Sequence, residues 1–268
     1  MVSTDNTPVP DYPGLLRLDG KRFVVVGAGQ GIGRQTSHAL ASVGAKLLCV
    51  DNRDDLAKEI SEEVGGVPFV ADATKREDAD AAVAACVSEF GGIDGMVDIV
   101  GMARYGDAVD TSDDDWNWTF DMVLRHAYVF SQAAAKAMTD GGAMVFVASV
   151  SGISSAPRHA AYGAAKAGLL NLTGTLAVDY APKVRVNAVT AGLVKTEQSH
   201  LFYGDEEGIA AVGATVPLGR MAEPSDVADV CLFLASPLSR YVTGESIVVH
   251  GGGEWPAYMS AAKPAPSS

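Results

Sequence analysis

Seven short apolar runs, separated by longer segments of helical character, constrain the fold of this chain more than any other feature. The runs are residues 22–27, 46–51, 67–71, 95–100, 143–149, 184–189 and 246–250. Between them, segments such as 31–44 and 75–91 space their apolar residues as helices packed on a sheet do. Strands that are apolar at nearly every position must be buried on both faces, which a parallel sheet covered by helices provides. The sequence therefore predicts an α/β fold, a doubly wound (Rossmann) seven-stranded parallel sheet with helices on both faces.

The domain organisation follows from the length of the chain and from its composition. With 268 residues, 48% of them hydrophobic, the chain can bury one large core. No linker, internal repeat or change of composition marks a second domain, so we expect one Rossmann domain over 18–253. The Pro-rich segment 1–17 is expected to be irregular, and 254–268 to form a tail. Residues 193–216 form a long connection that mixes apolar with acidic residues, which favours a lid over the substrate.

The charge of the chain argues against several classes of partner. The 33 acidic and 20 basic residues give a formal net charge of -13, and no cluster of Lys or Arg interrupts it. Nucleic acid and anionic membrane surfaces are therefore not expected as partners. No run has the length of a membrane span, and no secretory signal pattern precedes the first predicted strand. A cytoplasmic location is predicted.

Cysteine and histidine usage argues against disulfides and metals. Cys49, Cys86 and Cys231 lie far apart, each within an apolar run, as buried thiols of a reducing compartment do. The five histidines are dispersed, and none forms a cluster with carboxylates at ligand spacing. No metal is expected.

A glycine-rich loop follows the first predicted strand. In the segment VGAGQGIGR (26–34) a helix begins directly after Gly27, Gly29, Gly31 and Gly33. Glycines at such a place let the backbone approach a pyrophosphate, whose charge the helix N-terminus stabilises. A tight turn that needs glycines for its own geometry is the alternative. The second predicted strand favours the first interpretation, because it ends in Asp51, where a carboxylate can accept hydrogen bonds from the ribose of adenosine.

Asp51 also bears on the choice of dinucleotide. Its carboxylate would repel the 2′-phosphate of NADP, and Gln30 stands in the loop where a basic residue could have bound that phosphate. NAD is therefore the favoured cofactor. Arg53 could turn towards a 2′-phosphate and reverse this preference, or it could be a solvated residue at the start of a helix.

The segment HAAYGAAK (159–166) places two titratable side chains on a helix of small residues. Tyr162 and Lys166 lie four positions apart, so they share one helix face a single turn apart. A close-packed helix with amphipathic side chains at its edge would explain the pair equally well. The pair alone does not separate these interpretations.

Taken together, these motifs resemble the short-chain dehydrogenase/reductase family over about residues 18–253. The glycine motif of the family matches residues 26–33, with Val26 in place of the usual Thr, and its adenine-contacting acid matches Asp72 in VADAT. Ser149 stands thirteen residues before Tyr162, as the active-site Ser of the family does. The segment VRVNAVTAGLVKTE (184–197) resembles the one that closes on the nicotinamide.

The resemblance implies an oxidoreductase that transfers a hydride between NAD and an alcohol or ketone. Tyr162 would take the alcohol proton, Ser149 would hold the substrate oxygen, and Lys166 would lower the pKa of Tyr162 towards neutrality. The implied cofactor-binding residues are Gly27, Gln30, Gly31, Ile32, Gly33, Asp51, Asp72, Ala73, Gly101, Tyr162, Lys166, Gly192, Val194 and Thr196. The residues expected to line one substrate pocket are Met102, Tyr105, Ile153, His159, Leu193 and Phe202. His159 could also serve as a general base, but Tyr162 and Lys166 make that role unnecessary.

Two departures from the family pattern concern turnover. The motif usually written NNAG is DIVG at 98–101, in which Asp98 can accept backbone hydrogen bonds but cannot donate as an amide does. The Asn that normally holds a water linking the Lys to solvent aligns with Val123. Backbone carbonyls could hold that water if the helix opened locally. A nucleotide-binding sensor or scaffold without turnover is therefore the alternative from another functional class.

The apolar character of the predicted pocket and the NAD preference favour oxidation of a medium-sized secondary alcohol, alicyclic, steroid-like or fatty-acyl. Reduction of a 3-oxoacyl thioester is the runner-up, although carrier-protein binding favours basic residues that this acidic chain lacks. The resemblance also implies a homotetramer, in which the long helix around 116–138 and the Tyr-bearing helix pack against their copies.

Overall fold

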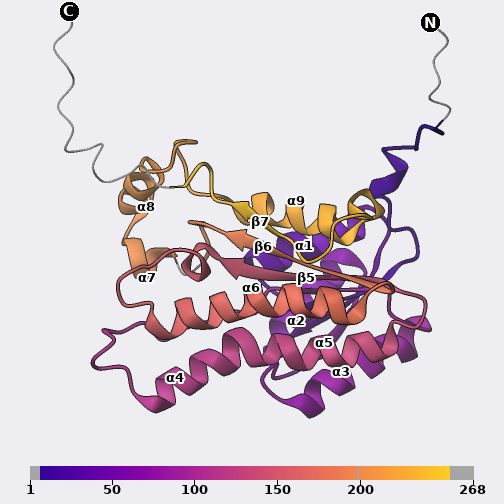
Figure 1. Cartoon of the computed structure of the whole chain (residues 1–268), viewed down its shortest axis with the longest axis horizontal. Coiled ribbons are helices and arrows are strands. Elements are labelled where there is room, and N and C mark those ends of the chain that lie inside the picture. The colour runs from indigo at the N-terminus through magenta and orange to yellow at the C-terminus, as the bar shows by residue number, and fades with distance from the viewer. Residues whose placement is uncertain (1–6, 198, 254–268) are drawn as a thin grey trace, which may run out of the picture.

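A computed structural model describes residues 7–197 and 199–253 of the chain, and it contains the predicted seven-stranded sheet (Figure 1). Every pairing is parallel, in the order β3-β2-β1-β4-β5-β6-β7. The strands are β1 (Arg22–Val26), β2 (Lys46–Asp51), β3 (Val67–Val70), β4 (Gly95–Asp98), β5 (Gly142–Ser149), β6 (Val184–Ala191) and β7 (Ser246–Val249). The order reverses between β1 and β4, which is where doubly wound sheets bind ligands.

Helices cover both faces of this sheet, as the apolar strands predict. They are α1 (Gly31–Ser42), α2 (Asp54–Val64), α3 (Arg76–Phe90), α4 (Asp113–Phe120), α5 (His126–Ala137), α6 (Ala160–Tyr180), α7 (Ser199–Tyr203), α8 (Glu206–Gly213) and α9 (Pro224–Ala235). Alternate residues of β1 enter different cores: Val24 packs with α3, α5 and α6, whereas Val25 packs with α1, α2 and α9. Figure 1 shows the two helix layers on either side of the sheet.

Local sequence signals fix where the helices begin and end. The Ser112 hydroxyl accepts a hydrogen bond from the Asp115 N–H at the start of α4. Glu223 and Asp226 form a capping box at the start of α9, and Pro224 occupies its first turn. At the other ends, α2 and α3 stop at Gly65 and Gly91, which have φ angles of 66° and 80°. None of the helices among the described residues is long and apolar enough to span a membrane.

The long helix expected around 116–138 is present, with a widened turn in its middle. A π-helical segment, Asp121–Arg125, joins α4 to α5 without a break. Val123 lies in this segment and is fully buried. A π-helical turn leaves backbone groups that an α-helix would pair, so the helix is opened where the family pattern has an Asn.

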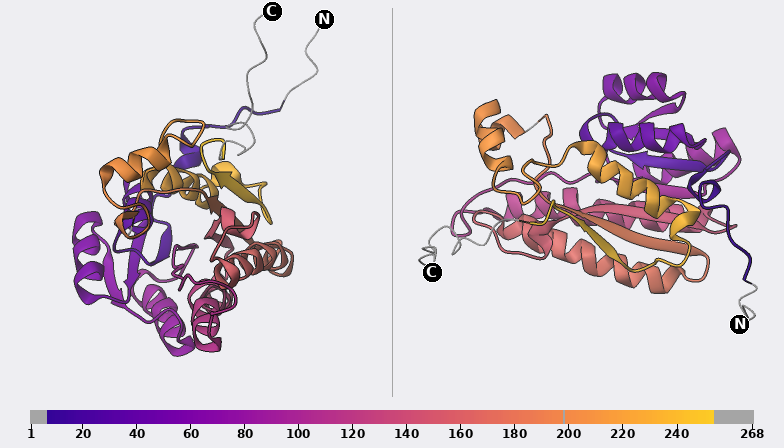
Figure 2. Two further views of the ribbon diagram at one scale, coloured as in Figure 1. Left: turned by 90° about the vertical axis from the view of Figure 1, so that its left-hand side faces the viewer. Right: turned by 90° about the horizontal axis from the view of Figure 1, so that it is seen from above.

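Two segments outside the sheet contain short helical elements. Residues 193–216, predicted as a long connection, contain α7 and α8, which lie beyond the carboxyl ends of the strands (Figure 2). The N-terminal segment contains a turn of 3-10 helix at Gly14–Leu16. The tail predicted at 254–268 lies outside the described residues.

Candidate functional site

The glycine-rich loop between β1 and α1 is shaped by contacts that exclude side chains. A Cβ at Gly33 would lie 1.8 Å from the carbonyl oxygen of Gly27, so only glycine lets α1 pack this closely. Gly27 has a φ of 80°, which places it in the left-handed region. Glycine is therefore required at both positions by the geometry of the loop itself.

Asp51 at the end of β2 is held against this loop. One carboxylate oxygen accepts a hydrogen bond from the Gly29 N–H at 3.0 Å, and the other accepts from the Arg53 N–H at 3.1 Å. The Arg53 side chain pairs with Asp55, and both are more than half exposed. The guanidinium is thus held by an exposed carboxylate of its own helix start, as a solvated residue would be.

A cavity of about 490 Å³ lies over the loop and Asp51. Nine of the predicted cofactor-binding residues line it: Gly27, Gln30, Gly31, Ile32, Asp51, Asp72, Ala73, Gly101 and Thr196. Met102, predicted for the substrate, lines it too, together with Met122 and Glu197, which the sequence analysis missed. Hydrogen bonds from Thr74 lower the pKa of Asp72 and keep it ionised.

The remaining predicted cofactor residues lie elsewhere. Gly33 lies beneath the loop. A Cβ on Gly192 would lie 2.6 Å from the Cβ of His250, so Gly192 packs closely on that residue. Val194 pairs with Ala222 in an isolated parallel β-bridge. Neither Gly192 nor Val194 lines the cavity, so for these two residues the structure supports a role in packing.

The cavity fits a dinucleotide. The N-terminus of α1 offers its Gly31 N–H into it, and that N–H already donates to a carboxylate oxygen of Glu197 at 3.1 Å. A carboxylate at this position shows that the helix terminus holds an anionic oxygen, which is what a pyrophosphate would present.

The structure brings the three predicted catalytic residues together. Ser149 is the last residue of β5, and its hydroxyl hydrogen-bonds to Tyr162 on α6. The Nζ atom of Lys166 lies 5.7 Å from the centre of the Tyr162 ring and donates to the Val147 carbonyl at 2.7 Å. Lys166 is buried, at 2% exposure, and burial lowers its pKa to about 8.

The expected lowering of the Tyr162 pKa does not occur in this structure. Burial raises the pKa of Tyr162, and the hydrogen bonds from Ser149 and Tyr105 oppose that rise without cancelling it. Lys166 turns its ammonium group to a backbone carbonyl instead of the phenol, which leaves burial dominant. Tyr105 lies against Tyr162 with ring centres 5.5 Å apart, as expected of a residue beside the reacting centre.

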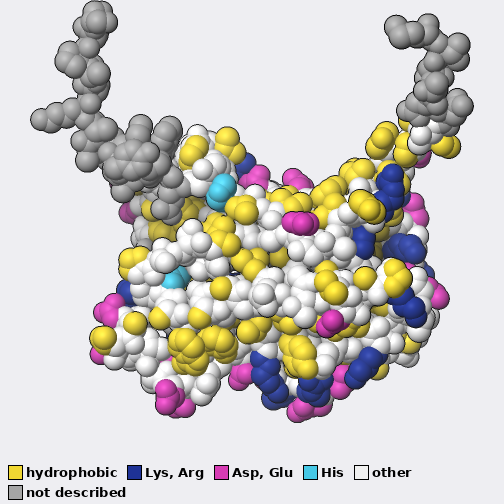
Figure 3. All heavy atoms as spheres, in the orientation of Figure 1, with side chains coloured by type: hydrophobic (Ala, Val, Ile, Leu, Met, Phe, Trp, Pro, Cys, Tyr) yellow, Lys and Arg dark blue, Asp and Glu magenta, His cyan; other side chains and the backbone are white. Residues whose placement is uncertain are grey.

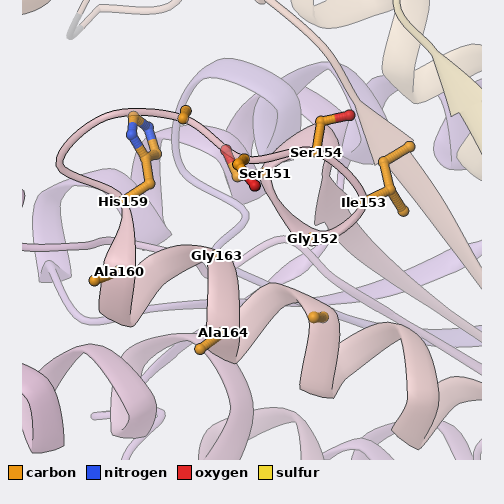
Figure 4. A pocket seen from close by; sticks show the side chains of 11 residues that line it. Ser151, Gly152, Ile153, Ser154, His159, Ala160, Gly163 and Ala164 are labelled. Carbon is orange, nitrogen blue, oxygen red and sulfur yellow. The ribbon is translucent and has the colours of Figure 1, made fainter.

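The residues predicted to line one substrate pocket are distributed over three cavities. Ile153 and His159 line a crevice of about 420 Å³ between the loop after β5 and α6, shown in Figure 4. Leu193 lines a small cavity of about 100 Å³ near His250, and Met102 lines the dinucleotide cavity. The cavities of the structure therefore do not join these residues into one pocket, and a shared substrate pocket stays a prediction. The side chain of Phe202 lies outside the described part of the chain.

The imidazole ring of His159 lies beside the rings of Tyr105 and Tyr162. The imidazole lies 4.7 Å from the Tyr105 ring and 5.9 Å from the Tyr162 ring, and Nδ1 contacts the Pro157 carbonyl at 2.6 Å. A ring nitrogen bonded to a backbone carbonyl is a donor, so this contact orients the ring. Within the described residues, no group of three His, Cys, Asp or Glu side chains could hold a metal ion.

The sequence analysis did not predict the contact between two buried polar residues, Asp98 and His126. Asp98, at the end of β4, accepts a hydrogen bond from the Val100 N–H, as the DIVG motif suggests, and it also contacts the buried His126. The sequence shows that Asp98 departs from the family pattern. It does not indicate that His126, 28 residues later in the chain, contacts Asp98.

Comparison with known proteins places the chain among oxidoreductases. The family model described as enoyl-(acyl carrier protein) reductase matches residues 27–254. The chain is 34% identical over 244 residues to a D-threitol dehydrogenase of Mycolicibacterium smegmatis, covering 88% of this chain and 94% of that protein. It is 35% identical over 245 residues to a 3-oxoacyl-[acyl-carrier-protein] reductase of Thermotoga maritima, covering 88% and 99%. It is 32% identical over 249 residues to a trans-4-hydroxycyclohexanecarboxylate dehydrogenase of Sinomonas cyclohexanicum, covering 88% and 93%.

Solved structures agree with these relatives. A short-chain type dehydrogenase/reductase from Mycobacterium marinum superposes with a TM-score of 0.86 at 30% identity, covering 92% of this chain and 100% of that one. A 7α-hydroxysteroid dehydrogenase complexed with NADH and 7-oxo glycochenodeoxycholic acid superposes with a TM-score of 0.84 at 27% identity, covering 90% and 97%.

Proposed function

Because the chain belongs to the short-chain dehydrogenase/reductase family, whose members use a nicotinamide cofactor, we propose that it is an NAD-dependent dehydrogenase of a medium-sized, mainly apolar secondary alcohol. One observation carries this proposal. Ser149, Tyr162 and Lys166 converge at the carboxyl ends of the strands, next to a cavity whose glycine loop is tied to Asp51. Open α/β sheets bind and convert their ligands at this edge.

The proposed mechanism divides the work among the three residues. Tyr162 takes the hydroxyl proton of the alcohol as the C–H hydrogen leaves as hydride. Ser149 orients the substrate oxygen towards Tyr162, to which its own hydroxyl is already bonded. Lys166, while protonated, favours the phenolate form of Tyr162 by its positive charge. When bound, the nicotinamide ring supplies the hydride acceptor.

The preference for NAD rests on Asp51 and Arg53. Both oxygens of the Asp51 carboxylate accept hydrogen bonds from backbone N–H groups, and this fixed negative charge at the end of β2 would repel a 2′-phosphate on a ribose bound there. Arg53, the residue that could neutralise such a phosphate, is paired with Asp55. A preference for NADP would require both arrangements to change.

The alicyclic or steroid-like character of the substrate is supported by two similar proteins. One is named for oxidation of a hydroxycyclohexane carboxylate and the other for a hydroxysteroid. Reduction of a 3-oxoacyl thioester remains the second candidate, because the Thermotoga maritima relative is named for it. The net charge of -13 opposes that candidate, since it disfavours an acidic carrier protein.

The test is a substrate panel with both cofactors. We expect reduction of NAD with cyclic secondary alcohols, and slower reaction with D-threitol and with an acetoacetyl thioester plus NADPH. A clear preference for the thioester and NADPH would replace the first candidate by the second. Binding of NADH, measured by its fluorescence, without turnover of any panel member would favour the sensor or scaffold interpretation.

We also propose a homotetramer assembled through α4, α5 and α6. An apolar groove of about 540 Å³ runs between these helices, lined by Phe120, Leu124, Tyr128, Gly168 and Leu172 among others. Figure 3 shows apolar side chains gathered where α6 lies beside α4 and α5. Sedimentation should give about four times the 27.7 kDa of one chain. A monomer in dilute buffer would refute this assembly.

Two further expectations remain part of the proposal. The segment 193–216, with α7 and α8, serves as the lid, and its position beyond the carboxyl ends of the strands supports this. A cytoplasmic location is supported by Cys49, Cys86 and Cys231, all of which are buried free thiols.

A further inference from the structure

A buried carboxylate and a buried imidazole meet beside the predicted catalytic lysine. Asp98 is 2% exposed and His126 is 1% exposed, and 3.0 Å separates Oδ1 of the first from Nε2 of the second. Burying two such groups costs more free energy than it returns unless they interact with each other or with a further charge. The pair links the end of β4 to the start of α5.

The hydrogen bonds of this pair leave one oxygen of Asp98 uncommitted. Oδ1 accepts from both Val100 N–H and His126, whereas Oδ2 is shielded from solvent without a hydrogen-bond partner among the described residues. Shielded carboxylate oxygens are almost always paired in folded proteins. Oδ2 therefore lacks the donor or positive charge that a buried carboxylate oxygen usually has, and Nδ1 of His126 is likewise buried without a partner among the described residues.

Lys166 supplies a positive charge near Asp98. Its Nζ atom donates a hydrogen bond to the carbonyl of Val147 on β5. Phe146, the residue before Val147, is the register partner of Asp98 on β4. Gly101 follows Asp98 by three residues, and a Cβ on Gly101 would lie 2.7 Å from the same Nζ atom. The ammonium group thus sits over the end of β4, and the charge of Asp98 acts to keep it protonated against the effect of burial.

The other titratable groups around the pair do not offer this charge. Strand β5 carries none, and Tyr162 and Tyr105 on the far side of Lys166 have pKa values raised by burial. On α3, which packs against α5, burial raises the pKa of the Cys86 thiol to about 12 and keeps it neutral, and Asp78 faces the backbone N–H of Asp72. Asp98 is the carboxylate whose charge raises the pKa of Lys166, and it acts from beyond direct contact, since no ion pair within 4.0 Å joins the two side chains in the described part of the chain.

We propose that Asp98 is the counter-charge that holds Lys166 as a cation, and that His126 is the positioning residue that donates a hydrogen bond to Asp98 and holds its carboxylate in place. This inference rests on the proposed function only in that Lys166 is the catalytic cation.

The decisive experiment follows the titration of Lys166 by NMR in the cofactor-free protein, labelled with ¹³Cε-lysine. The Lys166 signal is identified as the one that is missing from the spectrum of Lys166→Ala. The wild-type midpoint is expected near pH 8. Asp98→Asn keeps the shape and the acceptor for Val100, and it should lower this midpoint by about one pH unit or more. Thr173→Val, which removes a buried hydroxyl from the same helix, is the matched control and should leave it unchanged.

Two variants of His126 make the test independent of whether Asp98→Asn folds. His126→Gln retains a donor and should keep the wild-type midpoint, whereas His126→Leu should lower it. The proposal is overturned if the Lys166 midpoint does not move in Asp98→Asn. If Asp98→Asn does not fold, an unchanged midpoint in His126→Leu overturns it instead.

A second measurement separates this inference from the proposed function. In an active enzyme, the alkaline limb of the pH profile of kcat/KM should move to lower pH in Asp98→Asn and stay in place in Thr173→Val. If the NMR midpoint moves but no alcohol is oxidised, the proposed function fails and the role of Asp98 stands. If turnover is normal and neither the midpoint nor the limb moves, only the role of Asp98 fails.

Discussion

The carboxylate of Glu197 accepts a hydrogen bond of 3.1 Å from the backbone N–H of Gly31, the first residue of α1. The two residues are 166 positions apart, and the contact closes the segment after β6 over the glycine loop. The proposed function requires the same N–H for a pyrophosphate. Glu197 therefore competes with the cofactor for the helix terminus and repels its charge.

Replacing this carboxylate should strengthen cofactor binding. Glu197→Gln removes the charge but retains the length of the side chain, and we expect NADH to bind roughly three- to tenfold more tightly, the effect of one charge at a helix terminus. Titration of NADH fluorescence measures the change. Glu206→Gln is the control of equal charge, since Glu206 pairs with Lys195 on the surface of the same segment. Equal effects of both variants would assign the gain to net charge alone.

Asp51 should determine the choice between NAD and NADP. Asp51→Asn keeps an oxygen for the Gly29 N–H and removes the negative charge, so the ratio of kcat/KM for NADP over NAD should rise by about tenfold or more. Asp55→Asn, which frees Arg53 from its partner, should raise this ratio by a smaller factor. An unchanged ratio in both variants would show that the 2′-phosphate is recognised elsewhere.

Tyr162 should be needed for chemistry and not for cofactor binding. Tyr162→Phe removes the phenol that takes the proton, and we expect turnover to fall by about a thousandfold or more while NADH affinity stays within about twofold. Lys166→Ala should weaken both, because the ammonium group lies between Tyr162 and the dinucleotide cavity at Gly101. Appreciable residual turnover in Tyr162→Phe would transfer the acid–base role to another group.

Strand positions and the glycine loop could be predicted because they depend on local patterns. Each apolar run became a strand within two residues of its predicted end. The central strands β1, β2, β4 and β5 are buried on both faces, which leaves few polar positions to obscure the pattern. The loop and Asp51 were found for a similar reason, because a strand, a turn and a helix follow one another directly in the sequence.

The parts that could not be predicted depend on contacts between distant residues. Nothing in the sequence pairs His126 with Asp98 or Glu197 with Gly31, because side-chain periodicity carries no information across 28 or 166 positions. The grouping of the predicted substrate residues depends on such contacts too. Ile153 and His159 line a crevice between the loop after β5 and α6, and the His159 ring also lies 5.9 Å from the ring of Tyr162.

Val123 tests whether the opened helix replaces the missing amide. Val123→Asn introduces a polar group at a fully buried position, so we expect a loss of roughly 1–3 kcal/mol in the free energy of unfolding. Turnover should rise modestly or shift its pH profile, because the π-helical turn already offers backbone groups to a water path. An inert wild type together with an active Val123→Asn would favour the sensor interpretation for the natural sequence.

Stability should pass through a maximum near pH 9 in the cofactor-free protein. Burial lowers the pKa of Lys166 from 10.5 to about 8, so between these values the unfolded chain binds more protons and stability rises with pH. The opposite holds for the buried thiols of Cys49, Cys86 and Cys231, whose pKa values rise from 9.0 to about 11 or 12. Their stabilisation is fully present below pH 9 and is lost as the pH rises towards those values.

Above pH 9 the three thiols outweigh the one ammonium group, each proton contributing about 1.4 kcal/mol per pH unit, so stability should fall. Urea unfolding between pH 7 and 10.5, under reducing conditions, measures the curve. Lys166→Met should remove the rise between pH 8 and 9, and Cys231→Ala, which removes a buried thiol of α9, should reduce the fall above it. A wild-type curve that stays flat between pH 7 and about pH 8 and only falls above it would show that Lys166 keeps its ordinary pKa, and that its charge is compensated as fully as burial opposes it.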